Sequence, residues 1–303
     1  MKFLSSVLVL GLAVLPAGAT PIVDGTRDAE YGAPLAVQTV ETAFGDNLSE
    51  LDAGYAVVNG GKLYLMLTGN IEDNFNKLEI FIDSKPGGQS VFDSSGNDNA
   101  SAMDGLVFDA GFTADYHLIA RRGNDGGNDK FDVDFANLGA QSASGYGDIM
   151  GGHTGSGMTG TGVNAIGIEV GYNNSNLAGV LAGSAAASQA AATAVSTGLE
   201  LGIALSDLNF TGGVIRIMVG QNNQGHNYWS NQFLGGLPAP QDKLGSDEMG
   251  GFTGEGAIDL THFAGDQFFS IRAEVPEPAS ALLLGVTVSG LLSIWRRKRR
   301  FTP

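Results

Sequence analysis

Residues 62–83 read KLYLMLTGNIEDNFNKLEIFID and contain two runs of alternating apolar and polar residues, one on each side of an Asn-rich connection. The apolar positions are Leu63, Leu65 and Leu67 in the first run and Leu78, Ile80 and Ile82 in the second. Because successive side chains of a strand point to opposite faces, each run predicts a β-strand with one apolar face.

The same alternation recurs along the chain, without a convincing alternation of helices. Strong runs lie at 165–171 (with Ile166, Ile168 and Val170), 198–205 and 213–220, and weaker ones begin at positions 55, 105, 115, 130 and 267. The strong runs are short and bounded by Gly, Asn or Asp. The sequence therefore predicts an all-β fold, a single antiparallel, jelly-roll-like β-sandwich of about ten strands.

One segment breaks this pattern. Residues 177–197, LAGVLAGSAAASQAAATAVST, are rich in Ala, Ser and Thr. Alanine favours helix but buries little area, so a weak surface helix and a mobile insertion between strands both remain open. No Pro-Thr or Gly-Ser linker divides the rest, which predicts one sandwich domain over residues 20–274.

The composition limits the classes of partner. Acidic residues outnumber basic ones by 32 to 16, giving a formal net charge of −16. This charge disfavours binding of nucleic acid or anionic lipid through bulk electrostatics, and it favours solubility and divalent cations. The sequence has no cysteine, so disulfides and thiol chemistry are excluded.

The first 19 residues, MKFLSSVLVLGLAVLPAGA, have the order of a secretory signal peptide. Lys2 is followed by an apolar stretch and then by the small residues Ala17 and Ala19. We expect residues 1–19 to be removed and the mature protein to be exported.

Residues 275–303 contain a second targeting pattern. Pro276, Glu277 and Pro278 precede the uncharged residues 279–295. The basic residues that follow are Arg296, Arg297, Lys298, Arg299 and Arg300. A helix over 279–295 is about 26 Å long against about 30 Å of hydrocarbon, and the basic end matches the positive-inside rule for a cytoplasmic stop. This predicts a transmembrane helix.

The order of PEP triplet, short helix and basic end resembles the PEP-CTERM sorting signal of Gram-negative bacteria, a tail also filed under an ice-binding C-terminal name. The resemblance implies that an exosortase, a membrane-embedded cysteine transpeptidase, cuts near the triplet after the tail has held the chain in the inner membrane. The two prolines keep the triplet extended and outside the helix behind it. The mature protein would then reach the cell surface or the extracellular matrix.

The central domain has a looser pattern. Residues 23–39 contain D-G-x-x-D-x-x-Y, and residues 50–84 contain an LYL strand, an Asn-rich connection and a strand ending in FID. The run GLELGIALSDL at 198–208 is similar to E-x-x-I-P-x-x-L, with Ala204 in place of the proline. These segments resemble family 9 carbohydrate-binding modules and DOMON-like sandwiches. The resemblance implies a glycan-associated sandwich and assigns no ligand site.

Residues 221–236, QNNQGHNYWSNQFLGG, are the densest group of side-chain amides in the chain. Sugars are bound by an aromatic face and by Asn, Gln and His hydrogen bonds, because a pyranose has one apolar face and a rim of hydroxyls. The candidate ligand-binding residues are Asn222, Asn223, Gln224, His226, Tyr228 and Trp229. The alternative is that Trp229 and Phe233 are core residues beneath a loop whose amides satisfy backbone groups.

Acidic residues cluster at 93–104, DSSGNDNASAMD, and at 124–134, NDGGNDKFDVD. The first has the oxygen spacing of an EF-hand loop, but Asp98 stands where glycine is required, so it is not an EF-hand. A looser Ca²⁺ site is the remaining candidate. Its ligands would come from Asp93, Asp104, Asp129, Asp132 and Asp134. Solvated turns explain the same composition equally well.

Catalytic motifs are missing from the sequence. It has no Cys, GxSxG or HExxH, and its four histidines lack metal-ligand spacing. The sequence has 32 acidic residues, so the pair of carboxylates that a glycosidase requires remains an open alternative. We therefore expect a non-catalytic, glycan-associated protein of the cell envelope or exopolysaccharide matrix. A structural surface protein without a ligand and a glycoside-active enzyme are the alternatives.

Overall fold

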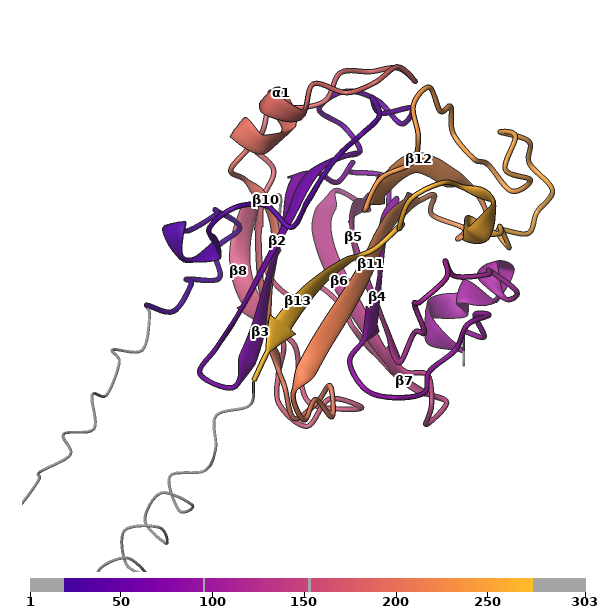
Figure 1. Cartoon of the computed structure of the whole chain (residues 1–303). Coiled ribbons are helices and arrows are strands. Elements are labelled where there is room, and N and C mark those ends of the chain that lie inside the picture. The colour runs from indigo at the N-terminus through magenta and orange to yellow at the C-terminus, as the bar shows by residue number, and fades with distance from the viewer. Residues whose placement is uncertain (1–18, 95, 152–153, 275–303) are drawn as a thin grey trace, which may run out of the picture.

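The structure is a computed structural model that describes residues 19–94, 96–151 and 154–274. In these ranges two antiparallel β-sheets pack face to face (Figure 1), which confirms the predicted all-β sandwich. The predicted signal peptide, apart from its last residue Ala19, and the predicted sorting tail at 275–303 lie outside the described residues.

One sheet has six strands in the order β1-β2-β3-β10-β9-β8. Their bounds are β1 (Ala36–Val37), β2 (Glu50–Asn59), β3 (Lys62–Asn70), β8 (Thr154–Met158), β9 (Glu169–Asn173) and β10 (Gly198–Ala204). The hairpin of β2 and β3 and the pairing of β3 with β10 place the strongest alternating runs at its centre.

The second sheet has seven strands in the order β12-β11-β4-β5-β6-β7, with β13 also on β11. Their bounds are β4 (Lys77–Asp83), β5 (Tyr116–Asp125), β6 (Asn128–Asn137), β7 (Ser142–Tyr146), β11 (Gly213–Asn222), β12 (Trp229–Leu234) and β13 (Phe269–Ala273). Two strands share one edge of β11: Gly213 lies opposite Ala273 of β13, and Val219 lies opposite Leu234 of β12.

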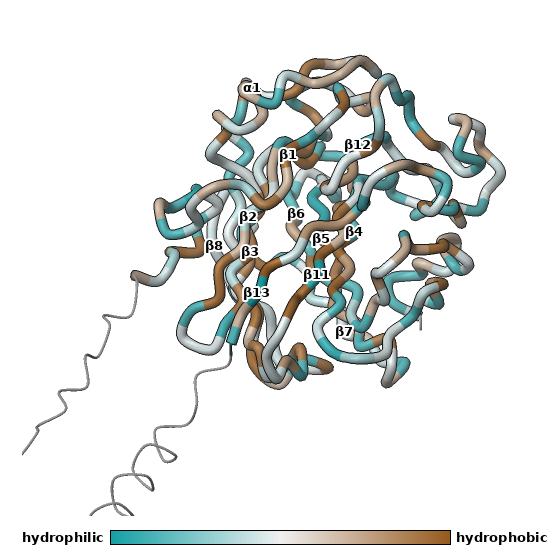
Figure 2. The backbone as a smooth tube through the Cα atoms, in the orientation of Figure 1, coloured by the Kyte–Doolittle hydropathy of each residue, from teal (hydrophilic) through white to brown (hydrophobic). Residues whose placement is uncertain are grey.

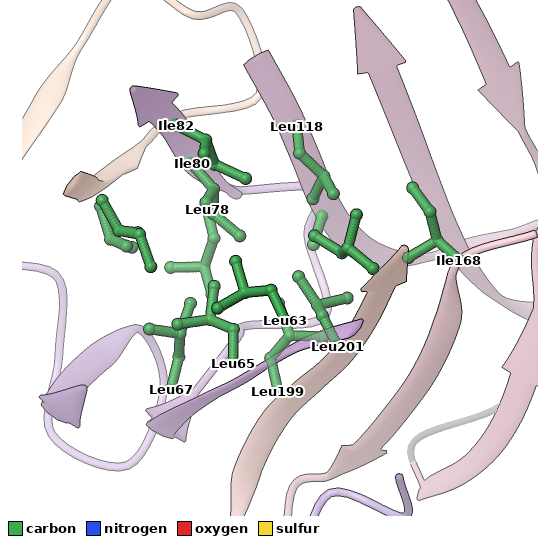
Figure 3. Close-up of a cluster of buried hydrophobic side chains, with 14 of the residues drawn as sticks. Leu63, Leu65, Leu67, Leu78, Ile80, Ile82, Leu118, Ile168, Leu199 and Leu201 are labelled. Carbon is green, nitrogen blue, oxygen red and sulfur yellow. The ribbon is translucent and has the colours of Figure 1, made fainter. Parts of the chain in front are cut away.

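The main core lies between the sheets (Figure 3). The six apolar positions of the 62–83 stretch all point into it and are at most 2 % exposed. They meet Leu118 of β5 and Leu199 and Leu201 of β10. The predicted inward faces of these strands are therefore confirmed.

Loops also cover parts of the outer faces of both sheets. Hydrophobic segments occur in these loops as well as in the strands (Figure 2). On the seven-stranded sheet, Phe81 and Met218 pack beneath residues of the 85–114 and 235–268 loops. On the six-stranded sheet, Tyr55 and Tyr64 pack beneath Tyr31 of the 3-10 helix η1 (Ala29–Tyr31).

The described ranges contain thirteen strands where the sequence predicts about ten. Strand β12 was missed because it lacks alternation: all six residues are buried, and Asn231 and Gln232 bond to backbone oxygens of residues 40 and 41. The Gly- and Ser-rich β7 and β8 and the two-residue β1 were also missed. The predicted strand at 105 is a loop with an isolated bridge at Val107, and Ile166 is exposed ahead of β9.

The Ala-rich segment 177–197 runs over the six-stranded sheet. It contains the short helix α1 (Gln189–Ala194), capped by the Ser188 side chain. Backbone hydrogen bonds join Thr42 to residues 181 and 183. The segment therefore contains a short helix, and the mobile insertion stays a prediction. The remaining 3-10 helices are η2 (Asn97–Met103) and η3 (Leu260–His262).

Candidate functional site

Three neighbouring strands place polar side chains on the outer face of the seven-stranded sheet. Lys77 and Glu79 alternate with core residues of β4, His117 and Arg121 alternate with core residues of β5, and Asp134 follows the same rule on β6. The strand register puts Lys77 directly opposite Arg121. Loops that carry Asp98 and His226 close over this face.

Glu79 is fully buried on this face, with one histidine on each carboxylate oxygen. His117 Nε2 lies 2.8 Å from Oε2, and Nδ1 of His226 lies 2.7 Å from Oε1. Burial acts to raise the Glu79 pKa, but the His226 charge and the hydrogen bonds outweigh it and hold that pKa well below the usual range. Glu79 is therefore ionised and fixes both imidazole rings.

The two histidines carry different charges. Burial lowers the pKa of His117, which favours the neutral ring, and the Asn97 amide nitrogen lies 3.3 Å from its Nδ1. Burial also acts to lower the pKa of His226, but the Glu79 charge and the hydrogen bonds to Asp98 and Glu79 raise that pKa to about 9. Of the two rings, His226 is therefore the one whose surroundings favour the protonated form, although the Lys77 charge acts against it.

Three basic groups lie close to one carboxylate oxygen of Asp98. Its Oδ2 lies 2.8 Å from Lys77 Nζ, 2.9 Å from Arg121 Nη1 and 3.2 Å from His226 Nε2. Burial acts to raise the Asp98 pKa, but the hydrogen bonds from His226 and Lys77 and the nearby Arg121 charge lower it to about 2. Lys77 Nζ also lies 2.6 Å from His226 Nε2. This nitrogen therefore has a donor, Lys77, and an acceptor, Asp98, within hydrogen-bonding distance.

These groups line an open pocket of about 340 Å³, the first hollow. Its side-chain lining consists of Phe75, Lys77, Asp98, Asn99, Arg121, Gln224 and His226. Four lining residues have left-handed backbone, with φ of 63° at Phe75, 43° at Asp98, 58° at Asn99 and 58° at His226. Non-glycine residues adopt this conformation rarely, and such positions cluster at functional sites.

Phe75 separates the first hollow from a second one. Its backbone N–H donates to Arg122 O at 2.8 Å, and a Cβ on Gly123 would lie 2.4 Å from its ring, so glycine is required there. The second hollow, of about 310 Å³, is lined by Phe75 together with Asn124, Asp125, Lys130, Asp132 and Asp148. We call the two hollows and the ring between them the Phe75 groove.

The amide-rich stretch contributes to this groove only in part. Gln224 and His226 line the first hollow. Asn222 and Trp229 are fully buried, and Trp229 Nε1 donates to Gly256 O at 2.8 Å. The indole therefore offers no face to a sugar, and the prediction of Trp229 as a binding platform is wrong. It is a core residue, as the alternative states.

The other two residues of that stretch serve the loop itself. Asn223 Oδ1 accepts hydrogen bonds from the backbone N–H groups of Gly225 and Asn227 at 3.1 Å. The half-buried Tyr228 ring is stacked with Phe44, with ring centroids 6.3 Å apart. Neither side chain lines the groove.

The predicted Ca²⁺ ligands have other partners. Asp104 accepts from the Ser94 N–H, and Asp132 accepts from the Asp148 N–H. Asp134 pairs with Arg121, Asp129 accepts from Asn124, and Asp93 lies in the loop before η2. Among the residues that the structure describes, no group of three or more His, Cys, Asp or Glu is placed to hold a metal ion. Turns and ion pairs account for these aspartates.

Sequence reasoning missed Phe75, Lys77, Glu79, His117 and Arg121. Charged residues at alternate positions of a strand are typical of a solvent-facing side, so Lys77 and Glu79 gave no sign of burial. One signal was available. Glu79, His117 and Arg121 all alternate with apolar core positions of their strands, which places the three side chains on the same face of the sheet.

The sorting residues Pro276, Glu277 and Pro278, the expected helix over 279–295 and the basic residues 296–300 lie outside the described residues. In the described part of the chain, none of the helices combines the length and apolar character that a membrane crossing requires. Comparisons with models of protein families, with curated proteins and with solved structures find no match. The geometry itself defines the class: a β-sandwich protein with a polar groove above a buried Glu–His pair.

Proposed function

We propose that the protein is an exported, exosortase-processed protein of the cell surface or exopolysaccharide matrix, and that it binds glycan chains in the Phe75 groove without cleaving them. The observation that supports binding is the groove: two open hollows with charged and amide side chains that share one partly exposed aromatic residue, Phe75. A sugar ring packs its apolar face on an aromatic side chain and directs its hydroxyls to charged and amide groups. Two adjoining hollows suit several linked rings.

The location rests on the sequence patterns at residues 1–19 and 275–303. The exosortase and, before processing, the inner membrane are the partners that these patterns imply. The transmembrane helix over 279–295 belongs to the same proposal. The intact mass of protein released by its native host should correspond to a chain without residues 296–300. A released chain that extends to residue 303 would contradict this part.

A glycoside-active enzyme is the second candidate, because two carboxylates share Arg121 Nη1. Asp98 has a pKa lowered to about 2, whereas burial raises the pKa of Asp134 despite its contact with Arg121. Carboxylates with pKa values moved apart are typical of acid–base pairs. Asp134 is buried, however, and lines neither hollow. Binding is therefore the better supported function.

A glycan-array screen of the purified protein tests the proposal. Phe75→Ala should weaken binding about tenfold or more, because it removes the aromatic face at the centre of the groove. Phe252→Ala is the matched control, since this exposed aromatic residue contacts Tyr228 and lines neither hollow. Release of product from a bound polysaccharide would favour the enzyme. Binding to no glycan would favour a structural surface protein.

A further inference from the structure

The carboxylate of Asp98 occupies a position surrounded by cations from three separate elements. Lys77 comes from β4, Arg121 from β5 and His226 from the loop between β11 and β12. All three nitrogens lie within 3.2 Å of the same oxygen, Oδ2. The protein thus surrounds one oxygen of the Asp98 carboxylate with basic groups, as an anion-binding site surrounds its ligand.

The cations are held by partners other than Asp98. The ring of His226 is fixed by Glu79, and the guanidinium of Arg121 is fixed by Asp134. Lys77 and Arg121 belong to the strands at the centre of the sheet. Of the three basic groups, which we call the basic cradle, His226 and Arg121 therefore have anionic partners besides Asp98, and Lys77 has His226 as its other neighbour. The low pKa of the Asp98 carboxyl agrees with this, because the surroundings favour an anion at this position.

Asp98 is more exposed than the groups that bind it. Its side chain is 21 % exposed, against 5 % for Lys77, 2 % for His226 and 15 % for Arg121. Asp98 and Asn99 both have left-handed backbone, with φ, ψ of 43°, 33° and 58°, 27°. Asp and Asn tolerate this region better than other non-glycine residues, and two in succession mark an irregular backbone of the kind found at ligand-binding sites.

We propose that Asp98 is an internal occupant of an anion site, and that the glycan which binds in the Phe75 groove carries a carboxylate, as in a uronic acid, that takes its place. This inference rests on the proposed glycan-binding function. The carboxylate of a uronic acid reproduces the group that Asp98 presents, and the adjoining ring can pack on Phe75. An internal occupant lowers the apparent affinity, because only the fraction of molecules with a vacant cradle binds.

Asp98→Asn tests the inference with polygalacturonate and its fully methyl-esterified form as probes. The variant should bind polygalacturonate about tenfold more tightly than the original protein, with no change for the ester, because it removes the competing charge. Glu30→Gln is the matched control: it lies above the opposite sheet and changes the net charge equally. The chain is acidic overall, with a formal net charge of −16, so an equal gain in Glu30→Gln would reflect bulk repulsion and overturn the inference.

Lys77→Gln gives an independent measurement if Asp98→Asn folds poorly. It should weaken binding of polygalacturonate about tenfold and leave the ester unaffected, because it removes one of three charges from the basic cradle. Equal loss for both polymers would overturn the inference and leave glycan binding standing. If neither polymer binds but free galacturonate shifts the His226 imidazole resonances of Asp98→Asn, the anion site stands and polysaccharide binding fails. Absence of both responses overturns the anion site.

Discussion

Glu79 and Glu200 are fully buried on the outer faces of opposite sheets, yet their pKa values move in opposite directions. Glu200 accepts hydrogen bonds from neutral donors, namely Tyr31 Oη at 2.7 Å and the backbone N–H groups of Asp24 and Gly25 at 2.9 and 3.1 Å. Burial raises its pKa to about 7 although these bonds act to lower it. Burial therefore does not decide the charge of a glutamate; a cationic partner such as His226 does.

The two glutamates also do different work. Glu200 attaches residues 24–31 to the face of β10, so its role is to hold the N-terminal segment over the six-stranded sheet. Glu79 keeps a positive charge on His226 at the floor of the Phe75 groove. The neutral type of site suits an anchor, and the charged type suits a binding surface.

Among single substitutions, the largest effect should come from Glu79→Gln, which leaves the His226 charge without its buried counter-charge. We expect the free energy of unfolding to fall by about 3 kcal/mol, measured by denaturant titration. The pKa of His226 should fall with it, as followed by NMR. Glu169→Gln is the control, because its ion pair with Lys62 is partly exposed and should contribute less than about 1 kcal/mol. An unchanged His226 pKa would contradict the assignment.

The second prediction is a pH dependence that distinguishes carboxyls with a raised pKa, such as Glu200, from Glu79, whose pKa is lowered. Burial raises the pKa of Glu200 and of Glu50 to about 7, and that of Asp52 to about 8 with help from the Glu50 charge. Groups with raised pKa stabilise the fold fully below their unfolded values and lose that contribution as pH rises through the folded values. Stability should therefore fall between about pH 5 and 9, by about 1.4 kcal/mol per pH unit for each proton.

The acid side of this profile should have the opposite sign. The pKa of Glu79 is lowered, so its contribution is present above its unfolded value and is lost as pH falls below it. Denaturant titrations across the pH range should thus show a maximum near pH 5. Glu200→Gln should flatten the alkaline slope between about pH 5 and 7. A slope that Glu200→Gln leaves unchanged would mean that this carboxyl does not titrate there.

The smallest effect concerns one hydrogen bond at the anchor. Tyr31→Phe removes the hydroxyl donor to Glu200 and should cost about 1 kcal/mol. It should raise the pKa of Glu200 further, because that bond acts to lower it. Hydrogen exchange at the amides of Asp24 and Gly25 should become faster, since residues 24–31 are held less tightly. Unchanged exchange would show that the two backbone bonds suffice.

Alternation alone was enough to predict the strands that face the main core. β4 has the bounds of the run KLEIFID, and β10 and β11 begin at the first residue of theirs, because each has one continuous apolar face. The same rule failed for the outer faces, because it assumes that the other side meets water. The loops 85–114 and 235–268 cover the seven-stranded sheet instead, so Trp229 became core and Glu79 became buried. The alternation within a strand carries no information about loops that lie over its outer face.

The shared edge of β11 has a mechanical consequence. β13 is the last strand of the described chain, and it runs antiparallel to β11 with Ala273 opposite Gly213 and Phe269 opposite Ile217. Tension that pulls residue 274 away from the sheet edge would load the Ala273 end first and open the pairs one after another, as a zipper opens. β12 holds the other half of that edge by separate bonds and would stay in place. Tension applied at residue 274 would thus open β13 before β12.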